Sequence, residues 1–192
     1  MANTNTKFRP KKMDSGSCCN NIVLIGFMGS GKSSVGAALA RSLSRVLLDC
    51  DTLIEQTESL RIAEIFAKEG EAGFRQKERA LAEWLACNVR NAVIATGGGL
   101  PIFYENIRNL GIVIYLKADF DTIHARLSRE ERAKRPLFAD ASNARALYEQ
   151  RAQIYAARAH HIIDTDKMGD SGGIHDITSA IVARLESKGI SQ

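Results

Sequence analysis

The sequence predicts a three-layer αβα fold, in which a five-stranded parallel sheet lies between two layers of helices. Short apolar segments rich in β-branched residues alternate with longer segments of helical period, which favours parallel strands joined by right-handed crossovers. Glycine-rich or acidic residues follow several of the apolar segments directly. The expected strands cover residues 21–25, 46–48, 92–95, 112–116 and 161–163.

The expected helices fill the intervals between these strands. In residues 32–43, Val35, Leu39 and Leu43 recur at helical spacing and give one apolar face. A longer helical region is expected over residues 57–88, with breaks near Gly70 and Gly73. Further helices are expected over residues 120–127, 143–159 and 174–187.

The chain of 192 residues is expected to form a single domain over residues 21–188. Residues 1–20 are polar and basic and lack the apolar stretch of a secretory signal, which predicts a disordered tail. The segment SREERAKRPLFADAS, residues 128–142, is a long polar insertion without a strong period. Such an insertion predicts a mobile lid.

The net charge and the cysteines indicate which partners and which cellular compartment to expect. The net charge of +4 is mildly basic, which fits either nucleic acid or arginines that hold small anions. We expect the second, with no nucleic-acid or membrane partner, and a monomer. The cysteines form no CxxC pair, so reduced thiols in a cytoplasmic protein are expected. They are Cys18, Cys19, Cys50 and Cys87.

The stretch GFMGSGKSS, residues 26–34, follows the first expected strand and fits the pattern G-x-x-x-x-G-K-[ST]. Backbone N–H groups of such a loop cradle phosphate oxygens, and the following helix adds its positive end. Lys32 supplies a charge to the β- and γ-phosphates, and the Ser33 hydroxyl suits Mg²⁺. The loop predicts nucleotide binding, but GTPases, motor ATPases and small-molecule kinases share it.

Asp49 and Asp51 end the second expected strand, in LLDCDTLIE. In an extended chain, spacing i, i+2 points both carboxylates to the same side. One could hold the water shell of Mg²⁺, and the other could bind acceptor hydroxyls or take a proton. The alternative is that Asp51 only caps a helix.

Two further motifs suggest an acceptor site. In EAGFRQKE, Phe74, Arg75 and Glu78 share one helical turn, although Arg75 and Glu78 could equally form a surface ion pair. In ATGGGLP, the three glycines at 97–99 let the backbone approach a ligand closely, the alternative being a loose turn.

Two arginines outside these motifs are further candidates. Arg135, in the expected lid, could close over a transferring phosphoryl group, or it could be a solvated charge. Arg151, in YEQRAQIY, suits a carboxylate ligand, or it could pair with Glu149 or Asp166.

The order GxxGxGKS, DxD, FRxxE, GGG, RPL and RxxxY closely resembles shikimate kinases, within the nucleoside-monophosphate-kinase-like P-loop proteins. The resemblance covers residues 21–166, and DxD, FRxxE and GGG together are far more specific than the phosphate loop. It implies ATP- and Mg²⁺-dependent phosphorylation of the 3-hydroxyl of shikimate on the route to chorismate. The products would be shikimate 3-phosphate and ADP.

The resemblance also implies a role for each matching residue. Lys32, Asp51 and Arg135 would be catalytic, and Ser33 and Asp49 would hold the metal. The acceptor would contact Asp51, Arg75, Gly97, Gly98, Gly99 and Arg151, with Glu78 supporting Arg75. ATP would contact Gly29, Ser30, Gly31, Lys32, Ser33, Ser34, Arg135 and an adenine-stacking arginine, for which Arg126 is the first choice and Arg129 the second. Residues 164–166 would also lie near the adenine.

Two other functions remain open at this point. A kinase of another polyol acid, such as gluconate, would keep the phosphate loop and the lid but would not need the DxD, FRxxE and GGG set. A nucleotide-binding module without transfer activity would not need a lid arginine or an arginine pair.

Overall fold

A computed structural model gives the structure of the chain, and it describes residues 20–127, 141–166 and 173–187. Nearly all of the expected tail and of the expected lid, including Arg129 and Arg135, lies outside these residues. Within the described ranges, every helix is too short or too polar to cross a membrane.

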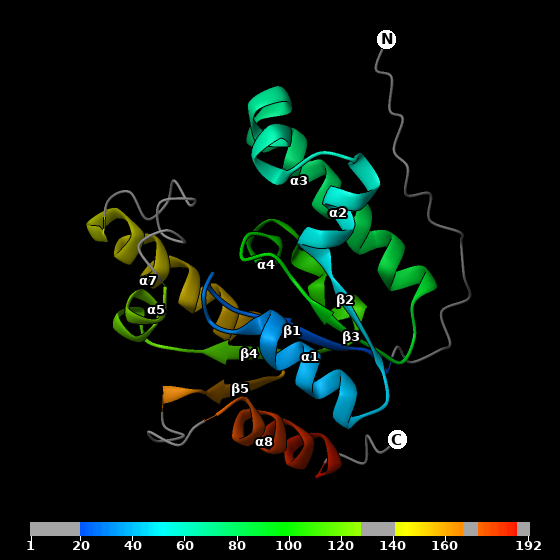
Figure 1. The fold of residues 1–192 in the computed structure, drawn as a ribbon, viewed down its shortest axis with the longest axis vertical. Coiled ribbons are helices and arrows are strands. Elements are labelled where there is room, and N and C mark those ends of the chain that lie inside the picture. The colour runs from blue at the N-terminus through cyan, green and yellow to red at the C-terminus, as the bar shows by residue number, and fades with distance from the viewer. Residues whose placement is uncertain (1–19, 128–140, 167–172, 188–192) are drawn as a thin grey trace.

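A single parallel sheet forms the centre of the molecule (Figure 1). Its strand order is β2-β3-β1-β4-β5, and every neighbouring pair runs parallel. The central strand β1 pairs with both β3 and β4, and all four of its residues are buried. The strands are β1 (Ile22–Ile25), β2 (Val46–Asp49), β3 (Ala92–Ala95), β4 (Ile112–Lys117) and β5 (His161–Asp164). The predicted strands are therefore confirmed to within one residue at each end.

Helices cover both faces of the sheet and enclose two apolar cores. On one face, α1 (Lys32–Ser42) and α8 (Ile174–Glu186) pack side by side, as Figure 1 shows. The other face carries the larger core, with Ile65, Leu81 and Tyr155 among its members. Its helices are α2 (Cys50–Glu58), α3 (Ile62–Asn88), α4 (Leu100–Phe103), the 3₁₀ helix η1 (Glu105–Leu110), α5 (Phe120–Arg126) and α7 (Ala141–Arg158).

The expected helix over residues 57–88 is wrong in its first part. A separate helix, α2, begins at Cys50, because the Asp49 side chain accepts a hydrogen bond from the Thr52 N–H at 3.2 Å. Ser59 then adopts a left-handed conformation, φ 57°, and ends α2. Gly70 does interrupt α3, but the expected break at Gly73 is absent from the helix.

The start of α7 also differs from the prediction. The helix begins at Ala141 and therefore takes in the last two residues of the expected lid. The short α4 and η1 were not predicted, because four to six residues give too little period to read.

Asn21 ties three strands together at the amino-terminal edge of the sheet. Its buried side-chain amide donates to the carbonyls of Val89 and Leu110, each at 2.9 Å, and accepts from the Ala92 N–H at 3.0 Å. Its own carbonyl accepts from the Ile112 N–H. The starts of β1, β3 and β4 are thereby fixed relative to one another, and so is the position of their other ends.

We expect Asn21→Ala to lower the free energy of unfolding by about 2–4 kcal/mol, because it leaves buried backbone groups without partners. Urea unfolding would measure the loss. Asn20→Ala is the matched control, since that side chain is exposed, and it should change stability by less than about 0.5 kcal/mol. Equal stability of the two variants would contradict the role given to the Asn21 amide.

Candidate active site

The phosphate loop connects β1 to the amino terminus of α1. Gly29 and Gly31 have φ of 81° and 88°, values that glycine adopts without strain. Gly31 is the N-cap of α1, and no side chain caps the helix there. A helix that begins in this way presents its first backbone N–H groups toward the loop, where they can bind phosphate oxygens.

Lys32 places its ammonium group against this loop. The side chain is only 8% exposed, and Nζ donates to the carbonyls of Gly26 at 3.0 Å and Phe27 at 2.8 Å. A buried cation held in this way at the amino end of a helix fits a polyphosphate.

Ser33 and Asp49 form an oxygen pair beside the loop. The Ser33 hydroxyl donates to Asp49 Oδ2 at 2.8 Å, while Oδ1 of the same carboxylate caps α2. Hydroxyl and carboxylate oxygens are the ligands that Mg²⁺ prefers, and Mg²⁺ usually takes its other ligands from water and phosphates. Among the described residues, no group of three or more His, Cys, Asp or Glu is placed to hold a metal.

Asp51 lies in the first turn of α2 rather than in an extended chain, which corrects the expected geometry of the acidic pair. The cap of α2 is Asp49, so the alternative role of Asp51 as a helix cap is wrong. Burial raises the pKa of the Asp51 carboxyl, and the charge of Asp49 raises it further, whereas Lys32 and Arg75 lower it. Asp51 thus lies within reach of the charges of two acidic and two basic side chains.

The glycine strip, Gly97–Gly99, runs against the acidic and basic side chains. A Cβ at Gly97 would lie 2.5 Å from Asp51 Oδ1 and 3.0 Å from Glu78 Oε1, and a Cβ at Gly99 would overlap the Arg75 guanidinium. The strip is therefore a site of close packing and not a loose turn. Without side chains, it also leaves the backbone open to a ligand.

Arg75 is held on several sides. It forms ion pairs with Glu71, at 2.9 Å, and with Glu78, and its guanidinium stacks 4.5 Å from the centre of the Phe103 ring. Glu78 is only 2% exposed, so its pair with Arg75 is not a surface contact. Burial raises the pKa of Glu78 to about 6, an effect that Arg75 partly offsets.

Arg151, on α7, is buried in the same region. Its charge acts on both Glu78 and Tyr155. In the described part of the chain no ion pair joins it to Glu149 or Asp166. Asp166 instead lies 3.9 Å from Arg126. Arg126 and the end of β5, both expected near the adenine, are thus brought together.

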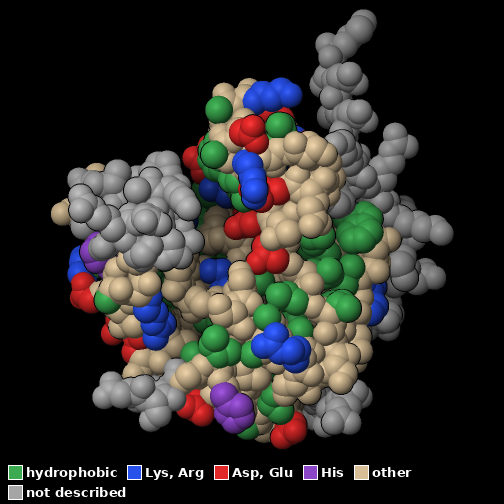
Figure 2. All heavy atoms as spheres, in the orientation of Figure 1, with side chains coloured by type: hydrophobic (Ala, Val, Ile, Leu, Met, Phe, Trp, Pro, Cys, Tyr) green, Lys and Arg blue, Asp and Glu red, His purple; other side chains and the backbone are tan. Residues whose placement is uncertain are grey.

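Together these residues line one edge of the sheet. Asp49, Asp51 and the glycine strip follow β2 and β3, and the phosphate loop follows β1, which pairs with β3. Figure 2 shows this face hollowed, with acidic and basic side chains close to the hollow.

Sequence reasoning missed three supporting residues. Glu71 stands four residues before Arg75, a spacing that could have revealed the ion pair. Tyr155 belongs to the RxxxY motif, but the motif does not indicate a role for it. For Phe103 the sequence carried no signal, because its stacking on Arg75 depends on how α4 packs against α3.

A phosphate loop alone is shared by switches, motors and kinases. Here the loop shares its edge of the sheet with a second group of charged side chains, among them Asp51, Arg75 and Glu78, packed against the glycine strip. Fold and site together define a P-loop kinase.

Comparison with known proteins then gives the family. The family model described as shikimate kinase matches residues 28–186. A shikimate kinase of Helicobacter hepaticus is 51% identical over 146 residues, which cover 76% of this chain and 87% of that protein. The chain belongs to the shikimate kinase family.

Solved structures agree with this assignment. A shikimate kinase from Acinetobacter baumannii, in complex with shikimate, is 34% identical with a TM-score of 0.79, over 88% of this chain and 94% of that one. A gluconokinase from Sinorhizobium meliloti is 18% identical with a TM-score of 0.53, over 88% of this chain and 94% of that one. The second likeness concerns the fold alone.

The raised pKa of Glu78 predicts a pH-dependent stability. The folded protein binds a proton more tightly than the unfolded chain, so this contribution is full below about pH 4.5 and is lost as the pH rises through about 6. We expect the free energy of unfolding of the parent, relative to Glu78→Gln, to fall by about 2 kcal/mol between pH 4.5 and 7.

Chemical denaturation at a series of pH values would measure this difference. Glu83→Gln, a partly exposed position on the same helix, is the control and should leave the pH dependence as in the parent. A parent and a Glu78→Gln variant with parallel pH profiles would contradict the prediction.

Proposed function

We propose that this chain transfers the γ-phosphoryl group of ATP to the 3-hydroxyl of shikimate, giving shikimate 3-phosphate and ADP. The observation that carries the proposal is the arrangement of Arg75, Arg151 and Asp51 around the glycine strip, beside the phosphate loop. Shikimate carries one carboxylate and three hydroxyls. Two arginines and an aspartate complement that pattern.

The acceptor half would work mainly by positioning. Arg75 and Arg151 would hold the carboxylate, and the backbone of Gly97–Gly99 would lie along the ring. Glu78 and Glu71 fix the Arg75 guanidinium before the acceptor arrives, so little ordering is left to binding. Held in this way, the hydroxyl would face Asp51 and the phosphate loop.

The donor half would bind the phosphates of ATP through Gly29, Ser30, Gly31, Lys32, Ser33 and Ser34. Lys32 would place its charge on the transferring group, where the transition state is most negative. Ser33 would ligate Mg²⁺ directly, and Asp49 would hold it through water. When bound, Mg²⁺ supplies further positive charge to the phosphates.

Asp51 would orient the acceptor hydroxyl and accept its proton. Burial and Asp49 raise the pKa of its carboxyl, which makes it a better base than a solvated aspartate. In a loose transition state the proton leaves late, so orientation accounts for much of its effect.

The remaining assignments rest on the resemblance. Arg135 would close over both substrates from a lid of about residues 128–142. Arg126 would stack on the adenine, a role supported by its position beside Asp166 at the end of β5. We further propose that residues 21–188 work as one kinase domain, as a monomer in the cytoplasm.

Comparison of acceptors tests the function. Release of ADP is measured with ATP and Mg²⁺ in the presence of shikimate, of gluconate or of no acceptor. We expect ADP release only in the reaction that contains shikimate. Turnover with gluconate would favour the polyol-acid kinase. Tight ATP binding without acceptor-dependent ADP would favour a binding module.

Asp51→Asn should lower kcat by at least about 100-fold, because the amide cannot accept the proton and holds the acceptor hydroxyl less strongly than a carboxylate does. The affinity for ATP should change by less than about threefold, since Asp51 lies on the acceptor side. Steady-state kinetics and ATP titration would separate the two effects. Asp176→Asn, on α8 and half exposed, is the control. Turnover near the parent rate would remove Asp51 from both proposed roles.

A further inference from the structure

We propose that Tyr155 is a positioning residue for the phosphate acceptor: its hydroxyl holds the glycine strip in register with Arg151 and the phosphate loop. The inference rests on the proposed function and adds a residue to that site. Tyr155 would act through the backbone that it holds and not by contact with the reacting atoms.

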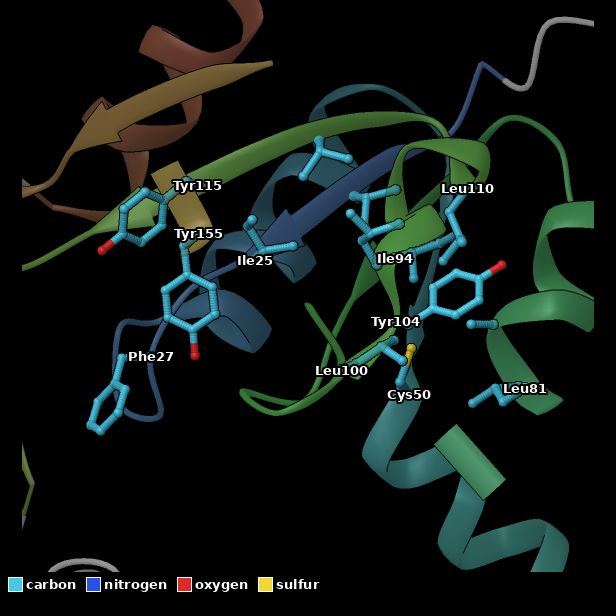
Figure 3. Close-up of a cluster of buried hydrophobic side chains, with 14 of the residues drawn as sticks. Ile25, Phe27, Cys50, Leu81, Ile94, Leu100, Tyr104, Leu110, Tyr115 and Tyr155 are labelled. Carbon is cyan, nitrogen blue, oxygen red and sulfur yellow. The ribbon is translucent and has the colours of Figure 1, made fainter. Parts of the chain in front are cut away.

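The central contact is one hydrogen bond. The Tyr155 hydroxyl donates to the Gly98 carbonyl at 2.6 Å and joins residues 57 positions apart in the chain. The side chain is completely buried, and its ring packs 5.3 Å from that of Tyr115 on β4. Figure 3 shows the hydroxyl of Tyr155 pointing away from the Tyr115 ring. A buried ring of this kind gives its hydroxyl one fixed position.

Gly98 is the point where the two halves of the site meet. A Cβ built on it would lie 3.5 Å from the Met28 N and 3.7 Å from the Gly26 carbonyl, both in the phosphate loop. The neighbouring glycines, Gly97 and Gly99, pack against Asp51 and Arg75. A shift of the Gly98 peptide would therefore move the strip relative to both the donor and the acceptor residues.

Tyr155 and Arg151 stand one turn apart on α7. Spacing i, i+4 places both on the same face of the helix, and the charge of Arg151 acts directly on the tyrosine. The bond from Tyr155 to Gly98 thus fixes the distance between the arginine and the glycine strip. An acceptor held by both would be displaced if that distance changed.

The hydroxyl keeps its proton over the working range. Burial raises the pKa of Tyr155 to about 12, although Arg151 lowers it in part. Tyr155 therefore donates to the Gly98 carbonyl throughout the range from pH 6 to 9. Loss of the bond should then reduce activity by the same factor at each pH.

Tyr155→Phe tests the inference, because it removes the hydroxyl and keeps the ring. Tyr148→Phe is the matched control: it lies on the same helix, and its hydroxyl also donates to a backbone carbonyl, that of Ala118, at 2.9 Å. Three measurements are made on each: steady-state kinetics from pH 6 to 9, calorimetric titration with shikimate alone, and thermal unfolding.

For Tyr155→Phe we expect kcat/KM for shikimate to fall about tenfold, by a constant factor across the pH range, as one lost hydrogen bond predicts. The Kd for shikimate should rise about fivefold, and the KM for ATP should stay within about twofold. Tyr148→Phe should keep both shikimate constants within about twofold.

Two results would overturn the inference. One is a Tyr155→Phe variant that melts at a lower temperature but keeps the parent Kd and KM for shikimate, since that would make the hydroxyl purely structural. The other is a variant that loses cooperative unfolding altogether. A parent without shikimate-dependent turnover would overturn the proposed function as well, whereas an active parent with an unchanged variant overturns the inference alone.

Discussion

The close approach of Asp51 and Arg75 to the glycine strip is the contact on which the site depends. Both side chains reach the backbone after β3 so closely that a methyl group at Gly97 or Gly99 would displace them. Their positions are set by close packing against the short connection between β3 and α4. Asp51 is thereby held against Gly97, and Arg75 against Gly99.

Helix α7 supports this arrangement from the other side. Its carboxyl end is fixed by Arg108, which donates to the carbonyls of Ala157 and Arg158, both at 3.0 Å. Arg158 in turn donates to the Tyr104 carbonyl at 3.1 Å, beyond the end of α4. Tyr155 and Arg151 therefore lie on a helix anchored to the same segment that follows the glycine strip. These hydrogen bonds fix the position of α7 relative to the segment that follows the glycine strip.

The fold could be predicted from the sequence because its central strands, β1, β3 and β4, are buried and rich in β-branched residues. β1 and β3 can be identified from their own apolar residues, without knowledge of the strands with which they pair. The start of α2 could not be predicted in the same way, since it depends on which carboxylate turns back to bond Thr52. For the site, residue types and order indicated Asp51, Arg75 and Arg151. Pattern alone did not reveal how they are held, because Phe103 and Tyr155 act through contacts between distant segments.

The hydrogen bonds of the Asn21 side chain lie at the edge of the sheet where the strands begin, opposite the edge that carries the candidate site. The chain enters β1 at Asn21, among the starts of β3 and β4, while the phosphate loop and the glycine strip leave from the opposite ends of the same strands. A protein fused ahead of residue 20 would join the molecule at the edge remote from the site. Attachment to a surface or to a partner enzyme through the amino terminus should thus leave the phosphate loop and the glycine strip facing outward.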